Sequence, residues 1–251
     1  ALPDAAATMA PTTRAAADRD AVVAQRLYAG SGDGLLHYTH DGGKTWQRAV
    51  LPGLPEFAHI HEIAPSPTDA NVALVACNNF FAGDYAPYVY KTTDGGAHWT
   101  SISANLPARG PTWTIGVDEV NPDLMFVGTM NGVYFSNTPQ AEWIKLSAGI
   151  PSAIQVMSLA IQRDEHDLVV STYGRGVYIL DDYTPLRTLN AKSIETPAML
   201  LPSADAPMFI QADPLGFPGT AFQGASFYSA SNPEVGAVIT YFVKDDYKSL
   251  K

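Results

Sequence analysis

The sequence predicts an all-β protein assembled from similar units of about four strands each. Three observations indicate this fold class. The hydrophobic segments are short, rich in Val, Ile, Tyr, Phe and Trp, and bounded by Gly, Asn, Asp or Pro. The chain of 251 residues contains 20 glycines and 19 prolines, which indicates many turns and few long helices. The third observation is an internal repeat of about fifty residues.

Composition limits the classes of partner. Hydrophobic residues make up 46% of the chain and charged residues 16%, which is typical of a globular protein. The net charge of −10 would repel a polyanion, so we expect no nucleic-acid partner. The single cysteine, Cys77 in "NVALVAC", excludes a disulfide framework and is predicted to be a buried small residue. No run of about 18 apolar residues exists, so we expect no transmembrane segment in this chain.

Residues 1–25 form a lead that is rich in Ala and Thr. This lead lacks the apolar core that a signal peptide requires. It fits a tether that remains after a signal or lipid anchor is removed, and it fits an interdomain linker equally well.

One turn sequence recurs along the chain. "THDGGKTWQ" and "TTDGGAHWT" carry Thr, Asp, Gly and Trp at identical spacing, and a weaker copy, "SNTPQAEW", keeps a Ser and the Trp. We expect the aspartates to accept hydrogen bonds from backbone N–H groups of their own turn, and the glycines to supply backbone angles that a side chain would forbid. We expect each tryptophan to bury its ring between strands. We call these turns the staples and predict a structural role for their residues: Thr39, Asp41, Gly43, Trp46, Thr92, Asp94, Gly96, Trp99, Ser136 and Trp143.

The segments between the staples repeat as well. After each tryptophan comes a Leu-Pro or Ile-Pro step, and then a β-rich stretch: "HIHEIAPS", "TWTIGVDEV" or "QVMSLAIQ". A polar turn leads to a second strand, "NVALVAC", "DLMFVGT" or "DLVVSTY". Gly34, Gly132 and Gly176 each precede a further strand. About four strands per repeat of this length is the period of a β-propeller blade.

The repeats predict the domain organisation. Residues 26–183 hold about three and a half four-stranded blades, whereas a closed propeller needs about four to eight. We therefore expect a larger propeller, completed by the rest of a longer chain, which we favour, or by a partner chain. Residues 184–251 are predicted to be a Pro-rich connector and the first strand or strands of a second β domain. Its stretch "NPEVGAVITYFVKDDYKSLK" reads as a strand without a partner strand.

The staple resembles the Asp-box of BNR-repeat proteins, whose pattern is Ser/Thr-x-Asp-x-Gly-x-x-Trp. That family includes sialidases, the sortilin/VPS10 ectodomain and xyloglucan-cleaving glycoside hydrolases. "RLYAGSGDGLLHYTHDGGKTW", "DYAPYVYKTTDGGAHWT" and "STYGRGVYILDDYTPLR" are also similar to large bacterial exported proteins of sortilin-like or glycosyl-hydrolase-like type, over roughly residues 26–190. The resemblance implies a propeller followed by a linker and an immunoglobulin-like β domain. It also implies a periplasmic or extracellular location. Any association of the protein with a membrane would go through a partner or through an N-terminal anchor that is later removed.

The sequence offers few candidates for catalysis. Sialidases need three arginines around the substrate carboxylate, and the arginines of this chain show no repeat-related placement. Cleavage of a glycosidic bond by paired carboxylates would draw on acidic residues in loops at strand ends. Such residues are common in a protein with a pI of about 4.9, so we expect no catalytic site and no cofactor. The candidate carboxylates are Asp84, Asp118, Glu119, Asp181 and Asp182.

The stretch "HIHE" raises the question of a metal site. Alternation along a strand would place His59 and His61 on one face and Glu62 on the other. Two histidines at this spacing can share a metal ion, but a third ligand is not evident. We therefore expect no metal site.

Five residues are candidates for partner binding. The loop "NNFFAGDYAPY" presents Phe80, Phe81, Tyr85 and Tyr88, and long aromatic loops on rigid scaffolds are frequent contact sites. The alternative is that these rings cover the edge of their own blade. The fifth candidate is Arg175 in "GRG", which reads first as a turn whose glycines free the backbone; the alternative is that Arg175 projects near the propeller axis, where ligands and partners commonly lie.

Two functions remain open. The first is a non-enzymatic interaction or scaffold module, an exported β-propeller that binds protein partners within a larger assembly. The second is a carbohydrate-active enzyme or a glycan-binding relative of BNR-repeat glycoside hydrolases. A sugar platform needs exposed tryptophan, and once three tryptophans are assigned to the staples only Trp113 remains. This count favours the first function.

Overall fold

A computed structural model describes residues 25–147, 149–151, 153–190, 192–203, 206 and 236–244. In these residues the regular structure is β, apart from short 3-10 helices such as Phe80–Ala82, Thr184–Arg187 and Ser193–Glu195. Residues 1–24 of the lead and most of the predicted second β domain lie outside the described residues. The strands are β1 (Leu27–Gly30), β2 (Leu36–Thr39), β3 (Gln47–Ala49), β4 (His59–Pro65), β5 (Ala73–Asn79), β6 (Asp84–Thr92), β7 (Thr100–Ser101), β8 (Thr112–Val117), β9 (Leu124–Thr129), β10 (Gly132–Asn137), β11 (Ile144–Leu146), β12 (Val156–Gln162), β13 (Asp167–Thr172), β14 (Val177–Leu180), β15 (Ala198–Leu200) and β16 (Tyr241–Val243).

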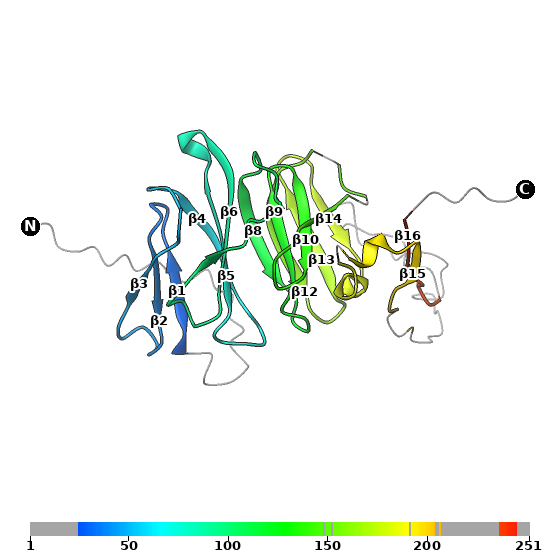
Figure 1. Ribbon diagram of the computed structural model, residues 1–251, viewed down its shortest axis with the longest axis horizontal. Coiled ribbons are helices and arrows are strands. Elements are labelled where there is room, and N and C mark those ends of the chain that lie inside the picture. Colours follow the sequence, from blue (N-terminus) through cyan, green and yellow to red (C-terminus); the bar gives the residue numbers. More distant parts are fainter. Residues whose placement is uncertain are drawn as a thin grey trace, which may run out of the picture.

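The first fourteen strands form four antiparallel sheets that stand side by side (Figure 1). Sheet 2 (β4–β7) and sheet 3 (β8–β11) each have four strands paired in chain order, and sheet 1 (β1–β3) and sheet 4 (β12–β14) have three. The first strands β4, β8 and β12 adjoin one another, and successive sheets pack face to face. These are blades of a β-propeller, and their strands amount to the predicted three and a half blades.

Apolar side chains fill each interface between neighbouring sheets. Leu36, Val75 and Cys77 lie in the cluster between sheets 1 and 2, and Phe126 and Val133 belong to the cluster that joins sheets 3 and 4. Cys77 is fully buried, as its apolar run predicted, and burial raises the pKa of its thiol far above the ordinary value. A thiol in this setting is a packing group rather than a nucleophile.

The strand order gives the stack of blades two rims. Because neighbouring strands run in opposite directions, the second-to-third-strand turns and the connectors between sheets share one rim, the upper rim, at the top of Figure 1. The first-to-second-strand and third-to-fourth-strand turns share the opposite, lower rim. In sheets 2 and 3 the staple joins the third strand to the fourth. The described strands β1–β3 of sheet 1 correspond to the second, third and fourth strands of sheet 2, and its staple joins β2 to β3. All three staples therefore lie on the lower rim. The aromatic loop after β5 lies on the upper rim.

Each staple is closed by side-chain hydrogen bonds to its own backbone. The carboxylate of Asp41 accepts from the N–H of Thr45 and that of Asp94 from the N–H of His98, each at 2.9 Å. In the third staple the hydroxyl of Thr138 accepts the equivalent N–H bond, at 3.1 Å. A hydroxyl can therefore replace the aspartate, which explains why the third copy keeps the turn without the full sequence pattern.

The staple tryptophans differ in burial. Trp99 and Trp143 are each 4% exposed, and their indole N–H groups donate to the carbonyls of Gly96 (2.9 Å) and Ile102 (2.8 Å). Trp46 is 44% exposed, so the prediction that it buries its ring is wrong. Trp99 and Trp143 pack in the clusters that join their own sheet to the preceding sheet. Trp46 stands on sheet 1, which no sheet precedes in the described residues.

The described residues near the C-terminus form a separate two-stranded pair. β16 pairs antiparallel with β15, with Met199 opposite Phe242. The prediction of an unpaired strand in this stretch is therefore wrong, because the segment expected to be only a connector supplies its partner. The immunoglobulin-like domain that the resemblance implies falls mainly outside the described residues.

Candidate functional site

An aromatic cluster lies on the upper rim where sheet 2 meets sheet 3. It gathers side chains from the start of β4, the β5–β6 turn and the start of β8, together with an arginine from the connector before β8. We call this group the rim cluster. Its members are His59, His61, Phe80, Phe81, Tyr85, Arg109 and Trp113.

The side chain of Asn78 anchors the turn that carries the two phenylalanines. Asn78 at the end of β5 is fully buried, and its amide donates to the carbonyl of Thr112 on sheet 3 at 2.8 Å. Its side-chain oxygen accepts the N–H of Phe80 at 3.3 Å. Gly83, at φ +80°, ends the 3-10 helix in the left-handed region and returns the chain to β6. The phenylalanines therefore stand on a turn anchored to both sheets.

Ring contacts hold the rim cluster together. The ring of Phe80 lies 5.6 Å from Phe81, 5.5 Å from Tyr85 and 5.8 Å from Trp113, measured between centroids. Phe81 nevertheless remains 74% exposed. The structure thus brings together three of the five predicted partner-binding residues and leaves one large apolar ring in contact with solvent.

The two histidines extend the cluster toward sheet 3. Their rings stack at 5.9 Å, and the ring of His61 meets Trp113 edge-on at 4.6 Å. Burial, and then the neighbouring His59, lower the pKa of His61. The prediction that Glu62 lies on the opposite face is wrong. A β-bulge between Ile60 and Glu62 turns its carboxylate toward sheet 3, where it accepts the N–H of Ile115 at 3.0 Å.

Trp113 does not form an exposed platform. It is only 7% exposed, because His61 and Phe80 cover it, so it is not the free sugar-binding ring that the tryptophan count suggested. Its indole N–H is buried without a hydrogen-bond partner. Across the described residues, no group of three His, Cys, Asp or Glu side chains is placed to hold a metal ion.

Arg109 adds a positive charge to the rim cluster. Its guanidinium lies over the ring of Tyr85, 5.0 Å from the centroid, and its backbone carbonyl accepts a hydrogen bond from Asn131. None of the ion pairs formed within the described part of the chain involves this arginine. Sequence reasoning missed Arg109, because only the fold brings its connector beside the aromatic turn.

The other two predicted partner-binding residues lie elsewhere. Tyr88 donates to the carboxylate of Asp84 at 2.7 Å and packs toward sheet 1, and burial together with this bond raises its pKa to about 12. Arg175 is exposed on the β13–β14 turn of sheet 4, which is on the upper rim but outside the rim cluster.

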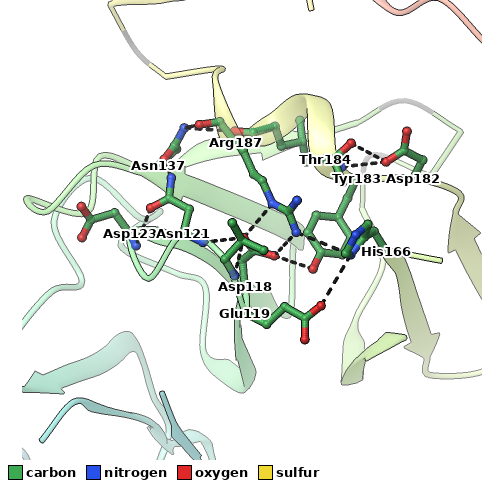
Figure 2. A network of polar contacts seen from close by, with 12 residues as sticks. Asp118, Glu119, Asn121, Asp123, Asn137, His166, Asp182, Tyr183, Thr184 and Arg187 are labelled. Atoms are coloured by element: carbon green, nitrogen blue, oxygen red, sulfur yellow. Dashed lines mark hydrogen bonds and ion pairs between the residues drawn. The ribbon is translucent and has the colours of Figure 1, made fainter. Parts of the chain in front are cut away.

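A network of polar side chains on the lower rim surrounds Asp118 (Figure 2). This carboxylate is fully buried and accepts two hydrogen bonds from Arg187, each 2.8 Å long. It also accepts the hydroxyl of Tyr183 at 2.6 Å and the N–H of Asn121 at 2.8 Å. Asp118 is therefore fully occupied as an acceptor and joins the segment after β14 to the β8–β9 turn.

The remaining candidate carboxylates also have structural partners or stand apart. Glu119 lies 3.7 Å from the imidazole of His166, and Asp182 accepts the N–H of Thr184 at 3.1 Å. Asp181 is exposed beyond the end of β14. Asp84 lies on the upper rim, at the opposite end of the strands from the other four.

The Asp118 network makes stability depend on pH. Burial, the largest influence, raises the pKa of Asp118, but hydrogen bonds from Arg187 and Tyr183 outweigh it and leave the pKa below the ordinary value. The stabilisation is therefore complete above the unfolded-state pKa of about 3.9 and is lost as the pH falls through the lower folded-state value. We expect urea unfolding to give a free energy that decreases below about pH 4. The Asp118→Asn variant should decrease less steeply, and an identical pH profile for both proteins would contradict this.

Comparisons with known proteins find similar architecture at low sequence identity. A GH74 enzyme from Niastella koreensis is 16% identical over 62% of this chain and 26% of its own, with a TM-score of 0.49. The GH74 xyloglucanase from Xanthomonas campestris is 19% identical over 62% of this chain and 27% of its own, with a TM-score of 0.48. YCF48 bound to D1 peptide is 17% identical over 64% of this chain and 48% of its own, with a TM-score of 0.48. This chain thus spans about a quarter of the two GH74 structures and about half of the YCF48 structure. No protein-family model matches the chain, and no curated protein matches it.

Proposed function

We propose that this chain is a non-enzymatic interaction module, an exported β-propeller that binds a protein partner through the rim cluster. The observation that carries the proposal is that one cluster holds both an exposed apolar ring, Phe81, and a cation, Arg109, that forms no ion pair with a carboxylate in the described residues. Aromatic and arginine side chains are enriched in protein interfaces and dominate their binding energy. The anchored turn presents Phe81, and Arg109, from the connector before β8, lies over the ring of Tyr85, so both groups have less conformational freedom to lose on binding.

The carboxylates argue for binding rather than catalysis. A glycosidase needs two carboxyl groups that face the substrate from either side of the scissile bond. Asp118 is fully buried and already accepts an arginine and a tyrosine, and Asp84 accepts the hydroxyl of Tyr88 on the opposite rim. The rim cluster itself lacks an exposed tryptophan, since Trp113 is covered.

The proposed location is the periplasm or the cell exterior. It rests on the resemblance of the repeats to exported proteins. No helical segment in the described part of the chain has the length and apolar character of a membrane span.

The proposal predicts a selective loss of binding from the upper rim. Immobilised chain is incubated with the exported proteins of its source, and the retained proteins are identified by mass spectrometry. We expect Phe81→Ala and Arg109→Gln each to reduce retention of a specific partner at least tenfold, because each removes about 1.4 kcal/mol or more of interface energy. Val120→Ala is the matched control, because Val120 is exposed on the lower rim.

Two results would contradict the proposal. If Phe81→Ala retained the partner as well as the wild type does, the rim cluster would not be part of the interface. Specific retention of oligosaccharides on a glycan array, abolished by the same two substitutions, would favour the glycan-binding alternative.

A further inference from the structure

Among the described residues, sheet 4 has no counterpart of the fourth strand that completes sheets 2 and 3. In sheet 3 the third strand, β10, pairs with a fourth strand, β11, and in sheet 2 β6 pairs with β7. The third strand of sheet 4, β14, pairs only with β13 among the described residues. No described strand therefore pairs with its outer edge, which we call the open edge.

The hydrogen-bond register shows which groups face this edge. Thr172 donates its N–H to the carbonyl of Gly176 at 3.1 Å, and bonded pairs alternate with unbonded pairs along an antiparallel ladder. Tyr178 and Leu180 consequently turn their backbone groups toward β13. The N–H and C=O groups of Val177 and Ile179 point away from β13, and the two side chains are 61% and 59% exposed.

A hollow beside β14 corresponds to the place where sheet 3 buries a tryptophan. Trp143 donates its indole N–H to the carbonyl of Ile102, and its cluster includes Leu106 and Tyr134. Its backbone N–H also donates to the side-chain oxygen of Asn105 at 2.7 Å. Ile102, Asn105 and Leu106 follow Trp99 at positions three, six and seven, and Tyr134 is the second residue of its Val-Tyr step.

The corresponding residues one repeat later line the hollow. Leu146, Gly149 and Ile150 follow Trp143 at the same three, six and seven positions, and Tyr178 is the second residue of the next Val-Tyr step. All four line the hollow next to β14. Leu146, Ile150 and Tyr178 thus repeat the apolar positions around Trp143, whereas Gly149 lacks the side-chain oxygen that Asn105 offers. No tryptophan of this chain lies in the hollow.

The chain itself is directed away from this position. After β14 it enters the 3-10 helix Thr184–Arg187, and Arg187 is fixed by Asp118 on the lower rim of sheet 3 (Figure 2). All four tryptophans of the sequence lie in sheets 1 to 3 or their turns, and residues 1–24 contain no aromatic residue. The occupant of the hollow must therefore come from outside these 251 residues if it is a tryptophan.

We propose that the open edge of β14 binds an extended strand from a polypeptide outside this sequence, which completes sheet 4 and inserts a tryptophan into the hollow. The strand pairs antiparallel with β14 through the outward N–H and C=O groups of Val177 and Ile179. The indole N–H of the incoming tryptophan donates to the carbonyl of Leu146, as that of Trp143 donates to Ile102. This is strand addition at a sheet edge with one aromatic anchor for specificity.

A peptide with the sequence of the third staple and β11, the fourth strand of sheet 3, tests the proposal. The probe is a labelled synthetic peptide with the sequence of residues 138–147, TPQAEWIKLS, and its matched control carries alanine in place of the tryptophan. We expect fluorescence anisotropy to give a Kd on the order of 100 μM for the probe, and at least tenfold weaker binding for the control. The peptide pair leaves the protein unchanged, so its outcome does not depend on how a protein variant folds.

Two protein variants locate the binding. Ile179→Pro removes an N–H group from the open edge without removing a bond to β13, and Ile150→Asp places a charge in the hollow. Each should weaken binding of the probe at least tenfold, whereas Phe81→Ala on the rim cluster should not. Equal binding of the two peptides, unchanged binding by Ile179→Pro, or no binding of the probe at about 1 mM would overturn the proposal.

Discussion

Replacement of Arg187 by alanine is expected to destabilise the chain by about 3–5 kcal/mol, because it leaves the buried carboxylate of Asp118 without its main partner. Asp118 is fully buried and receives two of its hydrogen bonds from this guanidinium. The matched control is Lys244→Ala, which removes an exposed ion pair with Glu195 and should cost about 1 kcal/mol or less. Urea unfolding monitored by circular dichroism measures both changes.

A double substitution tests whether the cost comes from the unpaired charge. We expect Asp118→Asn combined with Arg187→Ala to be less destabilised than Arg187→Ala alone, because the neutral amide removes most of the desolvation penalty. If Arg187→Ala and Lys244→Ala were equally mild, the network in Figure 2 would not fasten the segment after β14 to sheet 3.

The second large effect concerns the staple tryptophans. Trp99→Ala should destabilise the chain by about 3–5 kcal/mol, because it removes a ring that is 4% exposed and packed between sheets 1 and 2. Trp46→Ala changes the same residue of the same motif, yet Trp46 is 44% exposed, so we expect a cost of about 1 kcal/mol or less.

Thermal and urea unfolding of the two variants side by side measure this difference. The comparison tests burial, because the two staples share the Thr, the Asp, both glycines and the Trp at the same spacing. Equal costs for the two substitutions would mean that the tryptophan stabilises its own turn rather than the packing of one sheet on the next.

Local patterns predicted the blades well. The spacing of Trp46, Trp99 and Trp143, and the short β-rich segments between them, indicate strand order and turn positions, because a hairpin is specified by residues close in sequence. The predicted hydrogen bonds of Asp41 and Asp94 likewise depend only on residues of their own turn. These features lie within reach of sequence reasoning.

The errors concern properties that depend on a neighbouring sheet. Trp46 shares its motif with Trp99 but lacks a preceding sheet in the described residues. Trp113 is covered by residues from sheet 2, and a bulge, which alternation cannot reveal, reorients Glu62. The pairing of Asp118 with Arg187 joins residues 69 positions apart, and nothing in the local sequence signals it.

Photo-crosslinking in the source cell tests the central claim, that the upper rim binds a protein, most directly. A benzophenone amino acid replaces Phe81 in one variant and Val120 in another, so that one probe stands on the rim cluster and the other on the exposed lower rim. The account predicts a specific protein adduct from position 81 and none from position 120. No protein adduct from position 81, or the same adducts from both positions, would contradict it.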